Sequence, residues 1–289
     1  MKSVLEMRLT EDFMARPQLS GYVHSKFNRT MNLAFPGRLI TVITAKVPGM
    51  PDSIRVCDAT FRILNTLPEG MKFVKSGNQI LFAGGKGMQL FLDEAILCPD
   101  TIPGTGSSAF PRRQLMDAMK DFLLFNGFLR LTPFLRQKVF RQLINFCRAL
   151  FCGSAAEALL ACCGLGCGLT PCSDDALVGI MAACQAGLLP GAVLPDPHGL
   201  WDLLSGRTTD VSRKYLCCAA EGRFSAPLIA LFDKTSGETL RQRVGAVAAV
   251  GSTSGRDTLF GIALALRTGQ VKNSFPDLMS GSCGEVFTG

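Results

Sequence analysis

Short alternating runs of apolar and polar residues fill roughly residues 20–97. The runs RLITVITAKV, SIRVC, MKFVK, QILFAG and MQLFLD are rich in Val, Ile, Leu and Phe, and Pro- or Gly-containing turns separate them. One turn, AGGKGM, resembles a phosphate loop, but no Gly-Lys-Ser/Thr ends it, so we interpret it as a hairpin turn. The pattern predicts a β-rich domain over residues 1–104, with five to seven strands in a small barrel or sandwich.

Beyond this region the apolar positions recur at intervals of three and four residues, which predicts helices. The segment 98–113, CPDTIPGTGSSAFPRR, is dense in Pro, Gly and Ser and marks the boundary. Helix starts are predicted at Thr132-Pro133, at Asp210, and in the segments APLIALF and RDTLFGIALALRTG. Two more are predicted at capping boxes, which pair Ser154 with Glu157 and Thr235 with Glu238. The fold class is therefore α+β, with an essentially all-α domain over residues 105–289.

The uncharged run at 176–195 is long enough to raise the question of a membrane span. Gln185, Gly187, Pro190 and Gly191 interrupt it, and no basic anchor flanks it. We predict instead a buried core helix that ends near Gly187, and no membrane association.

Composition narrows the partners of this protein. The net charge is +7, but the basic residues are spread along the chain without interleaved aromatics or an RNA-binding motif. We therefore expect no nucleic acid, and the positive excess suits a small anionic substrate. Only 18% of the residues are charged, which fits an apolar surface covered by partner subunits.

The twelve cysteines favour a reducing compartment, because the first residues, MKSVLEMRLTEDF, do not form a signal peptide. Cys162, Cys163, Cys167 and Cys172 do not have the spacing of a zinc site or an iron–sulfur cluster. We interpret them as small apolar residues of packed helices, predict no metal site there, and expect a cytoplasmic protein.

One motif occurs twice in the second domain. GLTPCSDDALVGI (168–180) and GSTSGRDTLFGI (251–262) share Gly-x-Thr followed by Asp-x-Leu-x-Gly-Ile. Counting back from the helix, Asp257 matches Asp175, whereas counting from the threonine it matches Asp174. The repeat indicates a duplication or two helices packed about a pseudo-twofold axis. Gly179 and Gly261 lie inside these helices at a cost of about 1 kcal/mol relative to alanine, which predicts a close helix–helix contact.

Each copy places flexible glycines and hydroxyl groups at a helix N-terminus, where unpaired amides and the helix dipole attract anions. Two such termini facing each other would hold a small anion. A third segment, SGRTTDVSRKYL, adds an arginine and threonines at another helix start. The candidate anion-binding residues are Gly166, Gly168, Thr170, Ser173, Arg207, Thr208, Gly251, Thr253, Ser254 and Gly255.

The aspartates Asp174, Asp175 and Asp257 are the candidate catalytic residues. Each could simply cap its helix, because the dipole stabilises a carboxylate in the first turn. Three carboxylates in two matching loops instead indicate a divalent or monovalent cation, a substrate amide donor, or a proton-transfer role. No cofactor motif is present beyond this option.

The stretches GLGCGLTPCSDDALVGI, RTTDVSRKYLCCAAEGRFS and GSTSGRDTLFGIALAL together resemble a bacterial family that includes the AllH-type subunit of oxamate carbamoyltransferase, from allantoin and purine catabolism. The family loop is similar to Gly-Leu-Gly-Pro-Gly-Leu-Thr-Pro-Ser-Gly-Asp-Asp. Here Cys167, Cys172 and Ser173 replace its proline, its serine and the glycine before its two aspartates. The matching positions are Gly164, Gly166, Gly168, Thr170, Pro171, Asp174 and Asp175.

The resemblance implies a subunit of a multi-protein transferase that works with other products of the same operon. Oxalurate and phosphate would yield oxamate and carbamoyl phosphate, a reaction that needs stabilisation of oxyanions. Two alternatives stay open: a non-catalytic assembly subunit, and a carboxylase- or ligase-like enzyme that acts on another small amide or acid.

Overall fold

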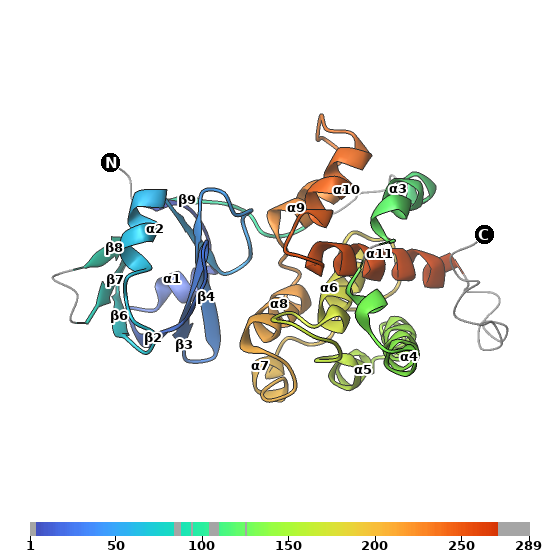
Figure 1. Cartoon of the computed structure of the whole chain (residues 1–289), viewed down its shortest axis with the longest axis horizontal. Helices are drawn as coiled ribbons and strands as arrows, with labels where there is room; N and C mark the ends of the chain where they lie inside the picture. The colour runs from blue at the N-terminus through green and yellow to red at the C-terminus, as the bar shows by residue number, and fades with distance from the viewer. Residues whose placement is uncertain (1–3, 84–87, 94, 104–109, 125, 271–289) are drawn as a thin grey trace. The chain divides into compact units, whose positions relative to one another are not determined.

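The N-terminal part of the chain forms one curled sheet (Figure 1). The computed structural model describes residues 4–83, 88–93, 95–103, 110–124 and 126–270. Its strands are β1 (Val4–Arg8), β2 (Gln18–Lys26), β3 (Thr30–Phe35), β4 (Arg38–Thr44), β5 (Ser53–Val56), β6 (Lys72–Ser76), β7 (Gln79–Phe82), β8 (Gln89–Phe91) and β9 (Ile96–Leu97). They lie in the order β8-β7-β6-β2-β3-β4-β5-β1-β9.

The predicted α+β class is confirmed, but the strand count and the sandwich alternative are wrong. Nine strands occur in the described residues, and all belong to a single half-barrel-like sheet. The count was too low because β1 lies before residue 20 and carries charged residues, while β9 has only two residues. The AGGKGM turn falls mainly on residues 84–87, outside the described part, between the antiparallel strands β7 and β8.

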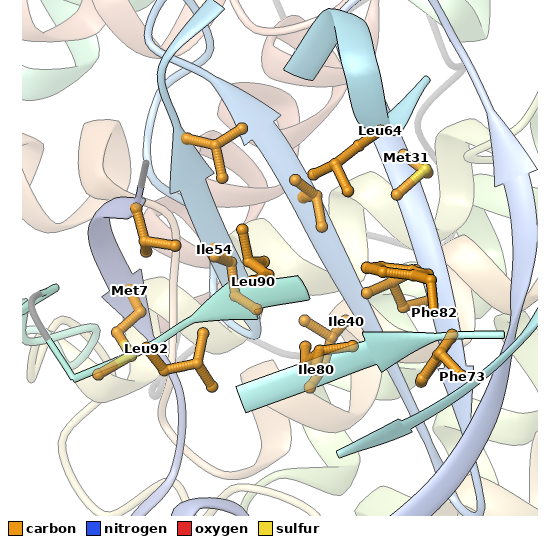
Figure 2. Packing of buried hydrophobic residues seen from close by; sticks show 14 of the residues in the cluster. Met7, Met31, Ile40, Ile54, Leu64, Phe73, Ile80, Phe82, Leu90 and Leu92 are labelled. Atoms are coloured by element: carbon orange, nitrogen blue, oxygen red, sulfur yellow. The ribbon is translucent and has the colours of Figure 1, made fainter. Parts of the chain in front are cut away.

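Two short helices, α1 (Glu11–Ala15) and α2 (Asp58–Leu64), contribute apolar side chains to the core of this sheet. Figure 2 shows strand residues such as Ile40, Ile80 and Leu90 packed together in that core. Phe13 of α1 begins a series of edge-on ring contacts that continues through Phe35 and Phe73, with centroids 5.1 and 4.9 Å apart. Such contacts add to the energy of apolar burial.

A segment from later in the chain completes this first unit. The chain divides into a unit of Met1–Thr101 with Arg223–Ile229, and a unit of Ile102–Gly222 with Ala230–Gly289. Within the first unit the buried Arg223 guanidinium contacts Asp52 at 2.7 Å and Asp100 at 2.8 Å. Because these charges are buried, they depend on each other for compensation.

The second unit is mostly helical. Its elements are α3 (Arg112–Met119), the 3-10 turns η1 (Lys120–Phe122) and η2 (Gly127–Arg130), α4 (Pro133–Ala149), α5 (Ala155–Cys162), α6 (Cys172–Gln185), α7 (Leu200–Leu203), α8 (Asp210–Ala220), α10 (Leu240–Ala248) and α11 (Ser254–Gln270). Helix α9 (Ala226–Phe232) begins in the first unit and ends in the second. The boundary at residue 104 stays a prediction, since residues 104–109 lie outside the described part.

Several predicted helix starts are confirmed and two capping boxes are not. Thr132 caps α4 by accepting a hydrogen bond from the Leu135 N–H, with Pro133 next to it, as predicted. Ser154 is the N-cap of α5, but its side chain accepts no capping hydrogen bond.

The other box lies four residues further along the chain. Thr239 and Gln242 form it reciprocally and start α10. Thr235 is not at a helix start, because its N–H and hydroxyl both donate to Asp233. The side chain of Thr235, the predicted capping residue, is therefore used in a turn with Asp233 and does not cap a helix.

The apolar run at 176–195 contributes a buried helix, as predicted. Helix α6 ends at Gln185, and Gly187 follows with φ +73°. Among the described residues, no helix combines the length and the apolar character that a membrane crossing requires.

Replacing Arg223 by alanine should destabilise the first unit, because it removes the guanidinium from two carboxylates that are shielded from water. We expect the free energy of unfolding to fall by about 3–5 kcal/mol. Arg241→Ala is the control, because Arg241 forms an exposed ion pair with Asp121 that should contribute less than about 1 kcal/mol. Urea denaturation followed by circular dichroism measures both, and equal changes would contradict the assignment.

Candidate functional site

Helices α6 and α11 make the most extensive helix–helix contact of the second unit, where they cross (Figure 1). A Cβ atom built on Gly179 would lie 2.0 Å from the carbonyl oxygen of Thr258. One built on Gly261 would lie 2.0 Å from the carbonyl oxygen of Ala176. The predicted close helix–helix contact at these glycines is therefore confirmed.

The contact is reciprocal, which settles how the two motifs correspond. Gly179 and Gly261 each lie three residues after the residue that the other one contacts. This register also aligns the first helical residues, Cys172 and Ser254. In the same register Asp175 precedes Ala176 as Asp257 precedes Thr258. Asp175 is therefore the structural counterpart of Asp257, and Asp174 aligns with Arg256.

The loops that precede the two helices meet directly. The Thr170 and Ser254 hydroxyl oxygens are 2.7 Å apart and share a hydrogen bond. We call residues 164–171 and 250–254, the last of which begins α11, the paired loops. The repeated motif thus produces two helix N-termini joined at their hydroxyl groups, and those termini carry partial positive charge.

Asp174 has a structural assignment in this site. Its Oδ1 accepts from the Gly164 N–H at 2.6 Å and from the Ser173 hydroxyl at 3.2 Å, and its Oδ2 accepts from the Thr208 hydroxyl. Burial raises the pKa of Asp174, while these hydrogen bonds oppose the rise. Asp174 therefore ties the first loop to the segment before α8, with the Arg207 carbonyl oxygen packed against Gly164.

Asp175 and Asp257 are different, because each keeps one buried oxygen, Oδ2, without a hydrogen-bond partner. Burial raises the pKa of Asp175 well above its usual value, the Asp257 carboxyl raises it further, and the Thr170 and Ser254 hydroxyls lower it. Burial also raises the pKa of Asp257 to about 6. The two counterpart carboxyls are thus both biased toward the protonated form.

Gly127 also belongs to this site, although sequence patterns did not predict it. Its N–H donates to Asp257 Oδ1 at 2.7 Å, and a Cβ atom there would lie 2.6 Å from Asp257 Oδ2. Asn126 orders the turn, since its side chain accepts from the Leu129 N–H. The Asn-Gly pair signals a turn, but no sequence pattern connects it to a residue 130 positions away.

The other predicted anion-binding residues differ in how far they are exposed to solvent. The Ser173 hydroxyl accepts a hydrogen bond from the Leu165 N–H. A Cβ atom built on Gly255 would lie 1.9 Å from the Val247 carbonyl oxygen. Both residues therefore serve the packing of the helical unit. Gly168, Arg207 and Gly251 are exposed at the surface of the paired loops and the adjoining segment. The structure therefore brings Thr170, Ser254, Asp175 and Asp257 together. The three exposed residues lie at the surface and not among these four side chains. Gly166 packs over the Cys172 backbone, and Thr253 is half-buried at the start of α11.

The interpretation of these cysteines as small apolar residues of packed helices agrees with the burial of three of them and is wrong for Cys167, which lies in the loop between α5 and α6. Cys162, Cys163 and Cys172 are buried and Cys167 is exposed. Burial raises the pKa of Cys172 to about 12, which keeps it a thiol. Within the described ranges, no cluster of three or more His, Cys, Asp or Glu side chains is arranged to hold a metal ion.

Adding a methyl group at Gly179 should separate α6 from α11, because the new Cβ would overlap the Thr258 carbonyl oxygen. We expect Gly179→Ala to lower the free energy of unfolding by about 1–3 kcal/mol or more. Gly245→Ala is the matched control: Gly245 lies inside α10, and its nearest neighbour would be 3.7 Å away. That control should gain up to about 1 kcal/mol from helix propensity. Chemical denaturation of both variants tests this, and equal signs would refute the close-contact assignment.

Asp257 should make stability depend on pH. A carboxyl whose pKa is raised in the folded protein stabilises it fully below the ordinary pKa of 3.8, and this contribution is lost as pH rises through about 6. Asp257→Asn removes this contribution and still lets Oδ1 accept from the Gly127 N–H. Relative to the wild type, the variant should gain about 1–3 kcal/mol between pH 4 and pH 8. Unfolding titrations at both pH values measure this, and a constant difference would contradict it.

The paired loops lie within a match to a known family. Residues 162–266 match the family model described as oxamate carbamoyltransferase subunit AllH. Residues 3–97 match the model of the AllH family N-terminal domain. No solved structure matches the chain. Since the two matches together span more than half of the chain and follow each other in order, the chain belongs to the AllH family and is a subunit of oxamate carbamoyltransferase, a transferase.

Proposed function

We propose that the paired loops of this subunit hold the oxyanion groups of the substrates of oxamate carbamoyltransferase. In the catabolic direction the substrates are oxalurate and phosphate, and the products are oxamate and carbamoyl phosphate. The observation that carries the proposal is the Thr170–Ser254 hydrogen bond, which joins the N-termini of two long helices at one place. Helix N-termini bind phosphate and carboxylate groups through their amides and their dipole.

The charged groups around the loops support an anionic ligand. Arg207 is exposed and its backbone lies beside Gly164, so a basic residue adjoins the first loop, and Arg256 lies in the first turn of α11. Guanidinium groups bind phosphate and carboxylate in a two-point geometry. Asp174 does not oppose this role, because its oxygens accept hydrogen bonds from the protein itself.

The proposal includes the setting in which the subunit works. Since the chain is a subunit of oxamate carbamoyltransferase, the enzyme has other subunits. We propose that these are products of the same operon and that they complete the site. The reaction would belong to allantoin and purine nitrogen catabolism in the cytoplasm. A cation at the Asp loops is not needed for the anion-binding role.

A non-catalytic assembly role is the second candidate. Leu124, Leu129 and Phe134 are large apolar side chains with 64%, 53% and 79% of their surface exposed. Such side chains fit contact with a partner subunit. The glycine contacts between α6 and α11 would then explain the repeated motif by packing alone.

Removing the joining hydroxyls distinguishes the two candidates. In the complex reconstituted with its other subunits, we expect the double variant Thr170→Ala/Ser254→Ala to lower kcat/KM for phosphate-dependent oxalurate breakdown by roughly 10²-fold. Thr66→Ala is the control, because the Thr66 hydroxyl donates only locally, to the Ile63 carbonyl oxygen. Full activity of an assembled double variant would favour the assembly role.

A further inference from the structure

Two buried oxygens of the helical unit lack the hydrogen bonds that such atoms normally make. They are Oδ2 of Asp175 and Oδ2 of Asp257. A buried polar group without a hydrogen bond destabilises the folded protein, so the presence of two such oxygens calls for an explanation. Both carboxyls lie in first helical turns that meet at the paired loops, and packing does not need a free oxygen there.

The two carboxyls differ in access. Asp175 keeps 8% of its surface exposed, whereas Asp257 keeps none. The Asp257 carboxyl is also held in place, because its Oδ1 accepts a hydrogen bond from the Gly127 N–H. Of the two carboxyls, Asp175 is therefore the one that keeps some exposed surface, although its Oδ2 is buried.

We propose that Asp175 exchanges a proton with the substrate nitrogen during carbamoyl transfer, and that Asp257 is a positioning residue that keeps this proton on Asp175. The proposal rests on the proposed function, in which the paired loops hold the substrates. It assigns the free Oδ2 of Asp175 to the nitrogen whose bond to the carbamoyl carbon breaks.

The chemistry needs such a group. In oxalurate breakdown a phosphate oxygen forms a bond to the carbamoyl carbon, and the C–N bond to the oxamate nitrogen breaks. The electron pair of that bond stays on the nitrogen, which is a poor leaving group unless it receives a proton. Asp175 gives that proton, and the proton carried by hydrogen phosphate returns to Asp175 once the acyl phosphate bond of carbamoyl phosphate forms. In the reverse direction the Asp175 carboxylate takes the proton from the oxamate amide.

The surroundings of Asp175 favour a retained proton. Helix α11 contributes Asp257, α6 contributes Asp174, and α8 contributes the half-buried Tyr215, whose phenol interacts electrostatically with Asp175. Burial and Asp257 raise the pKa of Asp175, and the hydroxyls of the paired loops lower it less. The acid is then still protonated at pH values where an exposed aspartate has lost its proton.

Two further charged groups complete these surroundings. Burial raises the pKa of Asp257 to about 6, and Arg130 of η2 is one of the groups that oppose this rise. Because the pKa of Asp175 is raised well above its usual value, Asp257 is the partner that ionises first. The buried Lys214 of α8 has its Nζ 5.3 Å from the centre of the Tyr215 ring. These groups contribute to the electrostatic surroundings of Asp175. In the proposal the proton is carried by the Asp175 carboxyl and not by any of them.

The test uses the reconstituted complex and follows oxalurate breakdown as a function of pH. Asp175→Asn should lower kcat at least about 10²-fold with little change in KM, because binding survives while proton transfer is lost. Asp175→Glu, which keeps a carboxyl, should recover part of that loss. Asp117→Asn, on the exposed face of α3, is the control and should leave kcat unchanged.

Asp257→Asn tests the positioning role by the pH profile. Breakdown needs protonated Asp175, so activity falls on the alkaline side as pH rises through its pKa. Removing the negative charge of Asp257 lowers the pKa of Asp175, so the alkaline limb of kcat/KM should move to lower pH. A residue with a merely structural role would change the height of the profile and not its position, so an unshifted limb overturns the proposal, even where Asp175→Asn fails to assemble.

The outcomes also separate this inference from the proposed function. An active Asp175→Asn complex, together with an inactive Thr170→Ala/Ser254→Ala complex, overturns the proton-transfer role and leaves the anion site standing. If variants at both places are fully active in assembled complexes, the paired loops are not the site and both proposals fail. Stabilisation of the Asp175→Asn complex by oxamate, equal to that of the wild type, supports a loss of chemistry rather than of binding.

Discussion

The contact between α6 and α11 at Gly179 and Gly261 is the constraint on which the site depends. Each glycine lets a carbonyl oxygen of the other helix approach to a distance that any side chain would block. That approach fixes the register of the two helices, and the register brings their first turns together. The Thr170–Ser254 hydrogen bond and the placement of Asp175 and Asp257 all follow from it.

The close approach also explains why the carboxyls are electrostatically costly. Helix dipoles favour a negative charge at each N-terminus, but they do not replace the water that burial removes. Two carboxyls that approach each other in this setting cannot both ionise without a large penalty. A protein can retain such a pair when at least one of the two carboxyls stays protonated. The raised pKa values of Asp175 and Asp257 are the expected consequence.

The sequence predicted this site unevenly, and the reason is the range of the interactions involved. The repeat, the helices that follow it and the glycine contact could be predicted, because each depends on residues a few positions apart. The pairing of Asp175 rather than Asp174 with Asp257 could not, since it depends on the register of a contact between distant segments. The N–H of Gly127 was missed for the same reason.

The fold shows the same division. Helix periodicity located α4, α8 and α11, whereas the sheet was underestimated because short edge strands carry little pattern. Capping was the least predictable feature: Thr235 has the right spacing to Glu238, but Asp233 competes for it. Local motifs therefore predict an element better than they predict the residue at which it begins.

The duplicated motif is symmetric in backbone and asymmetric in chemistry, which is the property that a site for two different substrates requires. Asp257 has a backbone N–H as its fixed donor and no exposure, while its counterpart Asp175 lies beside two hydroxyls and borders solvent. Asp174 has no acidic counterpart, because Arg256 occupies the matching position. In the roles that we propose, Asp175 of one copy exchanges a proton and Asp257 of the other copy supplies a negative charge next to it, so one helix contact would support two different roles.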